Sequence, residues 1–312
     1  MPGIGVVVNP HAGGNRRQRD RAAGFAQAVG DDGLVRQTGS LEEMEAVAHE
    51  FLKRQVEIVA ICGGDGSFFR TLSAIVRTYG SERPLPQFLP LRAGSMNTIA
   101  RSVGCRHGSP ERVLAHTVAD HRAGRPFETT ERHLVEVNHE HFGFMVGVGA
   151  VVNFLRLYYG GSARGRWAAA RLFALVVASG LIDVNPARGV LQTVEADVLC
   201  DGERVPHRRF NLIYASSITD IGLGFHATYL ATRKRDFFHL LAGRPRATQL
   251  IGRLRRLRCG WPLELDEWYD NLARHVTVEF PRPTQYMIDG DVFGAVAALD
   301  VRTGPRLTII RK

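Results

Sequence analysis

One stretch constrains the fold of this chain more than any other: Ile61-Cys62-Gly63-Gly64-Asp65-Gly66-Ser67. Residues 56–61 before it form an apolar run typical of a buried parallel strand, and after it apolar residues recur at helical spacing over residues 68–79. Glycines at such a strand-to-helix turn permit positive φ angles and let a ligand approach the backbone closely. Ser67 is predicted to cap the helix, whose first amides attract an anion.

Asp65 stands in the middle of this turn, where its charge would repel a phosphate. A cation such as Mg²⁺, or an acidic proton, between the carboxylate and the phosphate removes the conflict. A plain tight turn is the alternative, but it needs only the glycines. No G-x-x-x-x-G-K-[ST] segment occurs, so any nucleotide site here is not a P-loop.

Two further apolar strands also end in loops of small and polar residues. Residues 4–8 lead into Asn9-Pro10-His11-Ala12-Gly13-Gly14, and residues 88–91 lead into Arg92-Ala93-Gly94-Ser95-Met96-Asn97-Thr98. Ligands of open α/β folds bind at the carboxyl ends of parallel strands. The sequence therefore predicts one ligand site built from three strand ends.

Strands and helices alternate up to about residue 125, which predicts a parallel sheet with helices on both faces. A short strand is expected at 34–37, and Ser40-Leu41-Glu42-Glu43 is a capping box that opens a helix ending near Lys53. Ser109-Pro110 opens another helix, ending near His121. A helix with arginines in its first turn is expected at 15–29. Positive charge there opposes the helix dipole, and either a bound polyphosphate or plain solvation would offset this repulsion.

The second half of the chain has a different texture. Short strand-like runs separated by turn signals, among them Pro281-Arg282-Pro283 and Asp289-Gly290, predict an antiparallel β domain. The runs lie at 134–137, 141–148, 194–199, 210–215, 275–280, 286–288, 295–301 and 306–310, with helical stretches at 167–178 and 247–258. The prediction is an α/β nucleotide-binding domain at 1–126 and a β-rich, sandwich-like domain at 127–312, with a return of the last strands to the first domain left open.

The formal net charge of +9 predicts an anionic partner: nucleotide, acidic lipid or nucleic acid. Because no RNP, helix-turn-helix or zinc-finger signature occurs, a specific nucleic-acid partner is not expected. Four widely spaced cysteines predict free thiols in a reducing compartment and no structural metal. No signal peptide is recognised, and the longest apolar run, 172–184, is too short to span a bilayer. A cytoplasmic protein is expected, with peripheral membrane association and a homodimer both left open.

The three loops, in this order and with Asp289-Gly290-Asp291 near the C-terminus, resemble the diacylglycerol kinase catalytic domain family. That family includes soluble bacterial diacylglycerol and sphingosine-type lipid kinases, and it shares the GGDG turn with NAD kinases. The resemblance covers nearly the whole chain. It implies ATP and Mg²⁺ bound between an α/β domain and a β-sandwich domain, and phosphoryl transfer to the hydroxyl of a diacylglycerol-like or sphingoid lipid.

The resemblance also implies roles for individual residues. Asp289 would be the base for the attacking hydroxyl, although Asp-Gly alone is also a hairpin signal. Asp65 would be the second catalytic carboxylate and would interact with the metal through the nucleotide phosphates. Arg164 and Arg166 lie where related kinases carry a basic residue before a helix, and a solvated loop is their alternative. The residues expected to line the nucleotide site are Asn9, Gly63, Gly64, Asp65, Gly66, Ser67, Gly94, Ser95 and Asn97.

Three departures from the family pattern keep other functions open. Arg70 and Thr98 stand where the family usually has acidic residues, and residues 228–237 lack a usual Asp-Gly pair, which argues against a structural metal in the β domain. A non-catalytic binder of nucleotide or lipid is therefore one alternative. NAD kinase is another, but the third loop is more similar to lipid kinases.

A basic amphipathic helix is predicted near residue 250. Leu250, Ile251, Leu254 and Leu257 follow helical spacing, and arginines fill most of the gaps between them. Such a helix is typical of a membrane surface element. An ordinary domain helix that packs its leucines inward is the alternative.

Overall fold

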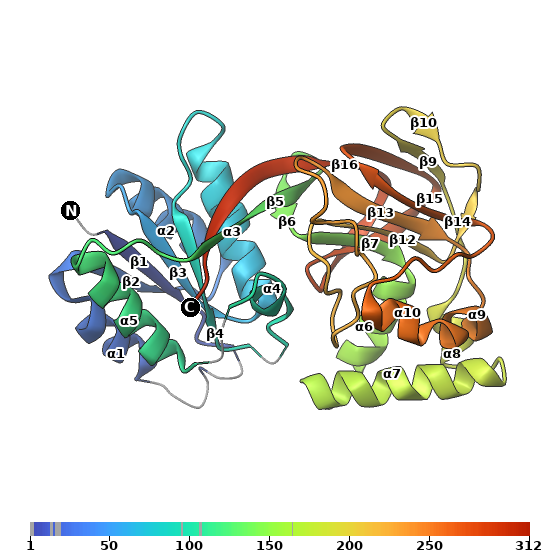
Figure 1. Ribbon diagram of the computed structural model, residues 1–312, viewed down its shortest axis with the longest axis horizontal. Coiled ribbons are helices and arrows are strands. Elements are labelled where there is room, and N and C mark those ends of the chain that lie inside the picture. The colour runs from blue at the N-terminus through green and yellow to red at the C-terminus, as the bar shows by residue number, and fades with distance from the viewer. Residues whose placement is uncertain (1–2, 13–14, 16–19, 95, 106–107, 164) are drawn as a thin grey trace. The chain divides into compact units, whose positions relative to one another are not determined.

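The computed structural model describes residues 3–12, 15, 20–94, 96–105, 108–163 and 165–312. The chain divides into two compact units (Figure 1): unit 1 is Met1–Arg132 with Pro305–Lys312, and unit 2 is His133–Gly304. The division falls within two strands, β5 (Thr129–Val137) and β16 (Asp291–Ile310). The C-terminal end of the chain therefore belongs to unit 1.

Unit 1 contains a parallel sheet with the strand order β16-β4-β3-β1-β2. The strands are β1 (Ile4–Val8), β2 (Gly33–Gln37), β3 (Ile58–Gly63) and β4 (Gln87–Arg92), and the end of β16 joins β4 through the pair Ile309 and Phe88. Every residue of β1 and β3 is buried, as expected for strands covered on both faces. The predicted parallel α/β architecture is confirmed.

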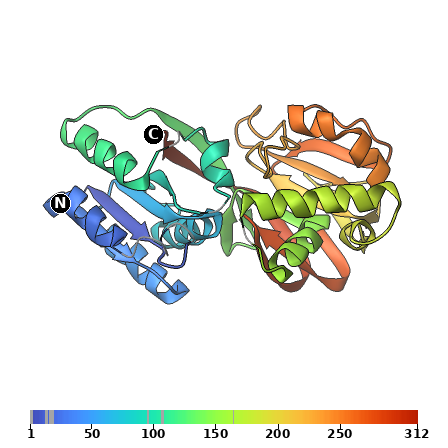
Figure 2. The same cartoon turned by 90° about the horizontal axis from the view of Figure 1, so that it is seen from below.

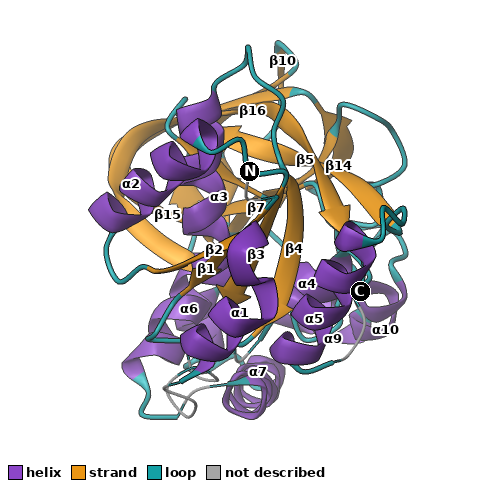
Figure 3. Cartoon of the chain, turned by 90° about the vertical axis from the view of Figure 1, so that its left-hand side faces the viewer, coloured by secondary structure: helices purple, strands orange, loops and turns teal. Residues whose placement is uncertain are grey.

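Helices cover both faces of this sheet (Figure 3). α1 (Arg21–Val29) and α5 (Pro110–Arg122) pack together on one face, where Phe25 and Leu114 join the buried core, and α2 (Leu41–Lys53) and α3 (Asp65–Tyr79) pack together on the other. Two short elements complete the unit, the 3₁₀ helix η1 (Gly30–Asp32) and α4 (Thr98–Ser102).

The predicted helix starts are borne out where local capping decides them. Ser40 Oγ accepts a hydrogen bond from Glu43 N at 3.2 Å, and the Glu43 carboxylate accepts one from Ser40 N at 3.3 Å, so the capping box of α2 is present. Ser109 caps α5 with Pro110 in its first turn. The start predicted for the first helix is wrong, because Asn15 lies before α1 and its side chain bonds to strand ends instead. Arg16, Arg17 and Arg19 lie outside the described residues.

Unit 2 is built on antiparallel pairing in the order β14-β13-β12-β7-β15-β16, with β9 paired to the first half of β15. This confirms the predicted β-rich second half. Its further strands are β6 (His141–Gly143), β7 (Met145–Gly149), β8 (Val194–Glu195), β9 (Asp197–Cys200), β10 (Glu203–Arg204), β11 (Arg209–Phe210), β12 (Leu212–Ser216), β13 (Phe238–Gly243), β14 (Trp268–Ala273) and β15 (His275–Ile288).

Two strand boundaries expected from the sequence are wrong. Pro281-Arg282-Pro283 does not end a strand, because β15 runs through it with a register shift between Glu279 and Thr284. Prolines are tolerated at such an irregularity, where the ladder lacks hydrogen bonds. Likewise, the runs at 295–301 and 306–310 are parts of one long strand, β16.

A helical layer covers one side of unit 2 (Figures 1 and 2). It consists of α6 (Ala150–Gly160), α7 (Arg166–Leu181), α8 (Ala187–Val190), α9 (Ala247–Gly252) and α10 (Leu254–Cys259). The single helix expected at 247–258 is in fact two, α9 and α10, which divide at Arg253. Within the described residues, no helix combines the length and apolar character needed to cross a membrane.

Candidate functional site

Three loops lie at the carboxyl ends of β1, β3 and β4, which are neighbours in the sheet. We call them the first loop (described residues 9–12 and 15), the glycine turn (63–67) and the third loop (94 and 96–98). Because the strands are parallel and adjacent, all three loops come to one edge of unit 1. Ser95, Gly13 and Gly14, expected to belong to these loops, lie outside the described residues.

Asn9 ties the first loop to the glycine turn. Its Nδ2 donates to Ser67 Oγ at 2.7 Å, and its Oδ1 accepts from His11 N at 2.8 Å. Ser67 is buried in the first turn of α3 and does not cap it: the helix begins at Asp65 and Gly64 is its N-cap. The predicted capping role of Ser67 is therefore wrong, because its hydroxyl serves as the acceptor for Asn9.

Asp65 ties the glycine turn to the third loop. Its Oδ2 accepts from Thr98 N and its Oδ1 from Ile99 N, each at 3.0 Å. The carboxylate thus holds the first amides of α4, which explains an aspartate between glycines on structural grounds. Because Thr98 contributes its backbone amide, its departure from the usual acidic residue leaves this contact intact.

Close packing explains why glycine stands at several of these positions. A Cβ on Gly94 would lie 2.2 Å from the Cα of Gly64, and one on Gly63 would lie 2.4 Å from the Cβ of Ser67. None of these three glycines has a positive φ, and Gly66 lies within α3, so the positive-φ explanation is wrong here. Gly64 and Gly94 are therefore explained by the contact of two loops, and Gly63 by the Ser67 side chain in its own turn.

Asn97 fixes the third loop from within. It has a left-handed backbone, with φ of 50°, and its side chain closes on Gly94 from both sides. Its Oδ1 accepts from Gly94 N at 3.0 Å and its Nδ2 donates to Gly94 O at 2.8 Å. Asparagine tolerates this backbone conformation better than most residues.

A buried support beneath the loops was not predicted. Asn15 is 4% exposed and donates through Nδ2 to Asn9 O at 2.7 Å and Cys62 O at 3.1 Å. Arg21 donates to Asn15 Oδ1 at 2.6 Å and pairs with Glu111 at 2.6 Å. Burial raises the pKa of the Cys62 thiol to about 11, so this thiol stays protonated. A polar residue within the glycine-rich first loop was the only signal for Asn15.

Asp289 occupies a two-residue hairpin between β15 and β16, in unit 2. Both Asp289 and Gly290 have positive φ, so the hairpin signal read from Asp-Gly is correct. Yet the aspartate is only 3% exposed, and its Oδ1 accepts from Met145 N at 2.8 Å and Phe144 N at 3.0 Å. The residue is both a turn former and a carboxylate held in a fixed orientation.

Tyr214 and Asp220 lie near this carboxylate and were missed by sequence reasoning. Tyr214, on β12, is buried, and burial raises its pKa well above the ordinary value, with the charges of Asp289 and Asp220 adding to the effect. Its hydroxyl therefore stays protonated. Asp220 is 5% exposed and accepts from Gly222 N at 2.8 Å.

The structure shows no contact of the remaining basic candidates with these clusters among the residues that it describes. Arg166 is the exposed first residue of α7 in unit 2, and Arg164 lies outside the described residues. Arg70 is exposed on α3. Among the described residues, no group of three or more His, Cys, Asp or Glu side chains is arranged to hold a metal ion.

Comparison with known proteins gives one family match, and it lies in the first unit. Residues 3–125 match the diacylglycerol kinase catalytic domain, which confirms the resemblance inferred from the loop motifs. No curated protein sequence matches the chain. Two solved structures from Bacillus anthracis are similar in fold over 100% of this chain and 97% of theirs, each at 14% identity. One is a provisionally named diacylglycerol kinase with a TM-score of 0.70, and the other is described as a diacylglycerol kinase, with a TM-score of 0.66.

Proposed function

We propose, from the match of residues 3–125 to the diacylglycerol kinase catalytic domain, that this chain is an ATP- and Mg²⁺-dependent lipid kinase. It would transfer a phosphoryl group to a hydroxyl of a diacylglycerol-like or sphingoid lipid. The observation that carries the proposal is the joining of three strand-end loops by the side chains of Asn9 and Asp65. Phosphoryl transfer asks a protein mainly for such rigid positioning and for charge neutralisation.

The nucleotide phosphates would lie against backbone rather than against the predicted polar side chains. Asn9, Asp65 and Asn97 each bond to protein groups of the loops. Their role is to hold the glycine turn and the N-terminus of the fifteen-residue helix α3 in place. A helix N-terminus carries partial positive charge and amide donors, which suit a phosphate.

Magnesium would enter with the nucleotide. Mg²⁺ commonly binds through one or two carboxylates together with substrate phosphates and water, and needs no cage of protein ligands. Asp65 is the acidic residue of the glycine turn, and its carboxylate is oriented by the amides of Thr98 and Ile99. The metal would neutralise charge that develops on the transferred phosphoryl group.

Asp289 would orient the lipid hydroxyl and accept its proton. Two backbone amides fix the direction of its carboxylate, and the neighbouring Tyr214 remains a neutral group. A buried carboxylate held in this way is pre-organised for general-base catalysis.

The test is phosphate transfer from labelled ATP in the presence of Mg²⁺ to diacylglycerol, monoacylglycerol, sphingosine, ceramide and NAD in mixed micelles. Asp289→Asn should lower the rate of lipid phosphorylation by about 10²–10⁴-fold, the range for loss of a general base. Glu279→Gln, which changes an exposed carboxylate on the same strand β15, should leave the rate unchanged.

The outcomes separate the competing functions. A labelled lipid that disappears in Asp289→Asn but persists in Glu279→Gln supports the lipid kinase and names its acceptor. Labelled NAD would make the chain an NAD kinase. ATP binding by calorimetry without transfer to any acceptor would contradict catalysis and support a nucleotide-binding protein.

A further inference from the structure

The outward face of α7 exposes large apolar side chains. Trp167 is 90% exposed, Leu175 is 55% exposed and Leu181 is 61% exposed, and Ile182, just past the helix, is 72% exposed. At 3.6 residues per turn, the three positions within the helix fall within about a third of its circumference, so they share one broad side. Figures 1 and 2 show α7 as a long helix on the outside of the helical layer of unit 2.

The fully buried residues of the same helix are small. Ala169, Ser179 and Gly180 are the buried residues of α7, and a Cβ on Gly180 would lie 2.9 Å from the Cβ of Ala247 in α9.

A surface helix of a soluble domain normally directs its large apolar residues inward. α7 has half-buried Leu172, Phe173 and Val176, with the Phe173 ring centroid 5.0 Å from that of Phe225, and it still exposes further large apolar side chains. This surplus marks the outward face as an interaction surface.

The helices predicted to dock on a membrane do not present such a face. Leu250, Leu254 and Leu257 are half-buried. The arginines between them bond to nearby loops of unit 2: Arg253 donates to Leu263 O at 2.6 Å and Arg256 pairs with Glu264 at 2.9 Å. The inward-packing alternative for this segment is therefore the better description.

The charged residues of α7 itself are all arginines, and Asp183, just past Ile182, is exposed and pairs with Arg188 at 2.8 Å. From Ala150 to Leu181 the sequence contains no Asp or Glu, while Arg156, Arg166 and Arg171 are exposed. No ion pair to Arg166 or Arg171 is present among the residues that the structure describes. A symmetric contact with a second copy would bring these arginines against each other, which is unfavourable. An anionic lipid surface complements both the charge and the apolar side chains.

We propose that this surface, Trp167, Leu175, Leu181 and Ile182 with Arg166 and Arg171, docks the protein on an anionic lipid bilayer. Trp167 would enter the headgroup region, where tryptophan is favoured. The arginines would contact acidic headgroups.

Hydrogen bonds within unit 2 link the start of α7 to the turn that contains Asp289, the candidate base. Gly165, just before α7, donates to Tyr158 Oη at 2.7 Å, and Tyr159 donates to Gly290 O at 2.8 Å. The first turn of α7 thus packs beside the end of α6, which contacts the turn that holds Asp289. Docking through α7 would hold this turn near the bilayer surface. The benefit of that position for catalysis rests on the proposed function, whereas the docking proposal is independent of it.

The test measures binding without nucleotide. The protein is cosedimented with vesicles of phosphatidylcholine, with and without phosphatidylserine, at low and high salt. Trp167→Ala/Ile182→Ser should bind the anionic vesicles at least about tenfold more weakly, because two large apolar groups are lost. Arg166→Gln/Arg171→Gln should lose about fivefold in affinity for each arginine, and salt should weaken the wild type more than this variant.

Matched controls change similar groups elsewhere. Leu41→Ala removes an apolar side chain that is 54% exposed on α2, and Arg54→Gln/Arg83→Gln removes two exposed charges from unit 1; both should bind like the wild type. Emission attributable to Trp167, obtained by subtracting the Trp167→Phe spectrum, should shift to shorter wavelength with anionic vesicles.

Two results would overturn the docking proposal. One is equal vesicle binding by the wild type and Trp167→Ala/Ile182→Ser, or no binding by either. The other is a wild-type dimer in sedimentation velocity that the same variant dissociates, since the face would then join two copies. Absence of kinase activity with intact vesicle binding would instead contradict the proposed function alone.

Discussion

The sequence suggests that Asp65 balances ligand charge, whereas the structure shows that its carboxylate links two loops by hydrogen bonds. Its two oxygens accept the amides of Thr98 and Ile99, and these bonds join the glycine turn to the third loop. If the carboxylate only balanced ligand charge, its replacement by a neutral group would not lower the stability of the protein without ligand. Because the carboxylate links two loops, its replacement should lower that stability.

Asp65→Asn tests this at the residue scale. The amide group keeps one acceptor oxygen but turns an NH₂ toward the second backbone N–H, which leaves a donor unsatisfied. The free energy of unfolding should fall by about 1–3 kcal/mol. Urea unfolding of the empty protein, followed by far-UV circular dichroism, measures it, with exposed Asp31→Asn as the control. An unchanged unfolding free energy with weakened ATP binding would mean that Asp65 acts only on the ligand.

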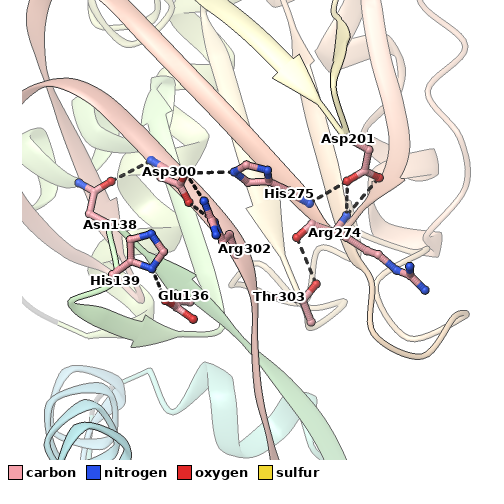
Figure 4. A network of polar contacts seen from close by, with 9 residues as sticks. All are labelled: Glu136, Asn138, His139, Asp201, Arg274, His275, Asp300, Arg302 and Thr303. Atoms are coloured by element: carbon pink, nitrogen blue, oxygen red, sulfur yellow. Dashed lines mark hydrogen bonds and ion pairs between the residues drawn. The ribbon is translucent and has the colours of Figure 1, made fainter. Parts of the chain in front are cut away.

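At the scale of elements, a polar network joins the strands β15 and β16 to the turns beside them (Figure 4). Asp300 on β16 contacts His275 Nε2 at 3.0 Å and accepts from Arg302 Nε at 2.6 Å. Asn138 closes the other side, accepting from Asp300 N at 2.8 Å. Asp201 receives the amides of Arg274 and His275. The long strand pair is therefore stabilised by hydrogen bonds to two carboxylates.

This network predicts a pH dependence of unit 2. The hydrogen bond from Arg302 lowers the pKa of Asp300 below its ordinary 3.8, burial opposes the shift, and His275 adds to it. Since the folded pKa lies below the unfolded one, this stabilisation is present above the unfolded pKa and is lost as pH falls through the folded pKa. Asp300→Asn should therefore flatten the acid-side loss of unfolding free energy.

The measurement is urea unfolding at several pH values from about 6 to about 3. Tryptophan emission is the suitable probe, because Trp167, Trp261 and Trp268 all lie in unit 2 with Asp300. Exposed Asp266→Asn serves as the control. An identical slope for the wild type and Asp300→Asn would show that this carboxylate does not contribute to acid sensitivity.

At the scale of the whole molecule, the last residues of the chain complete the first unit. Leu307, Ile309 and Ile310 are each 0% exposed, and Ile309 pairs with Phe88 of β4. Burying each such side chain contributes about 1.5–3 kcal/mol. Together they approach the net stability of a typical domain, about 5–15 kcal/mol.

Deletion of Pro305–Lys312 should therefore unfold unit 1 and leave unit 2 folded. The expected result is a loss of helical circular dichroism with tryptophan emission close to that of the full chain, since every tryptophan lies in unit 2. Removal of Lys312 alone, which pairs with Asp120, should have a much smaller effect. Retention of the full helical signal after the longer deletion would contradict the role given to these strand residues.

The sequence by itself determined the local elements of unit 1 and the composition of the strand-end loops. Continuous apolar runs marked β1 and β3, and the capping residues Ser40 and Ser109 marked the starts of α2 and α5. These features depend on neighbouring residues alone, so they can be read from the chain. The order of the loop motifs was specific enough to indicate the family.

Only the tertiary structure decided how distant groups combine. The bond from Asn9 to Ser67 and those from Asp65 to the third loop join residues far apart in the chain. The same holds for the bonds of Asp289 to Phe144 and Met145, and for the outward face of α7. A helical pattern reports which residues share a side, but not whether that side meets the core or the solvent. That choice depends on the packing partners, here α8 and α9, which no local pattern specifies.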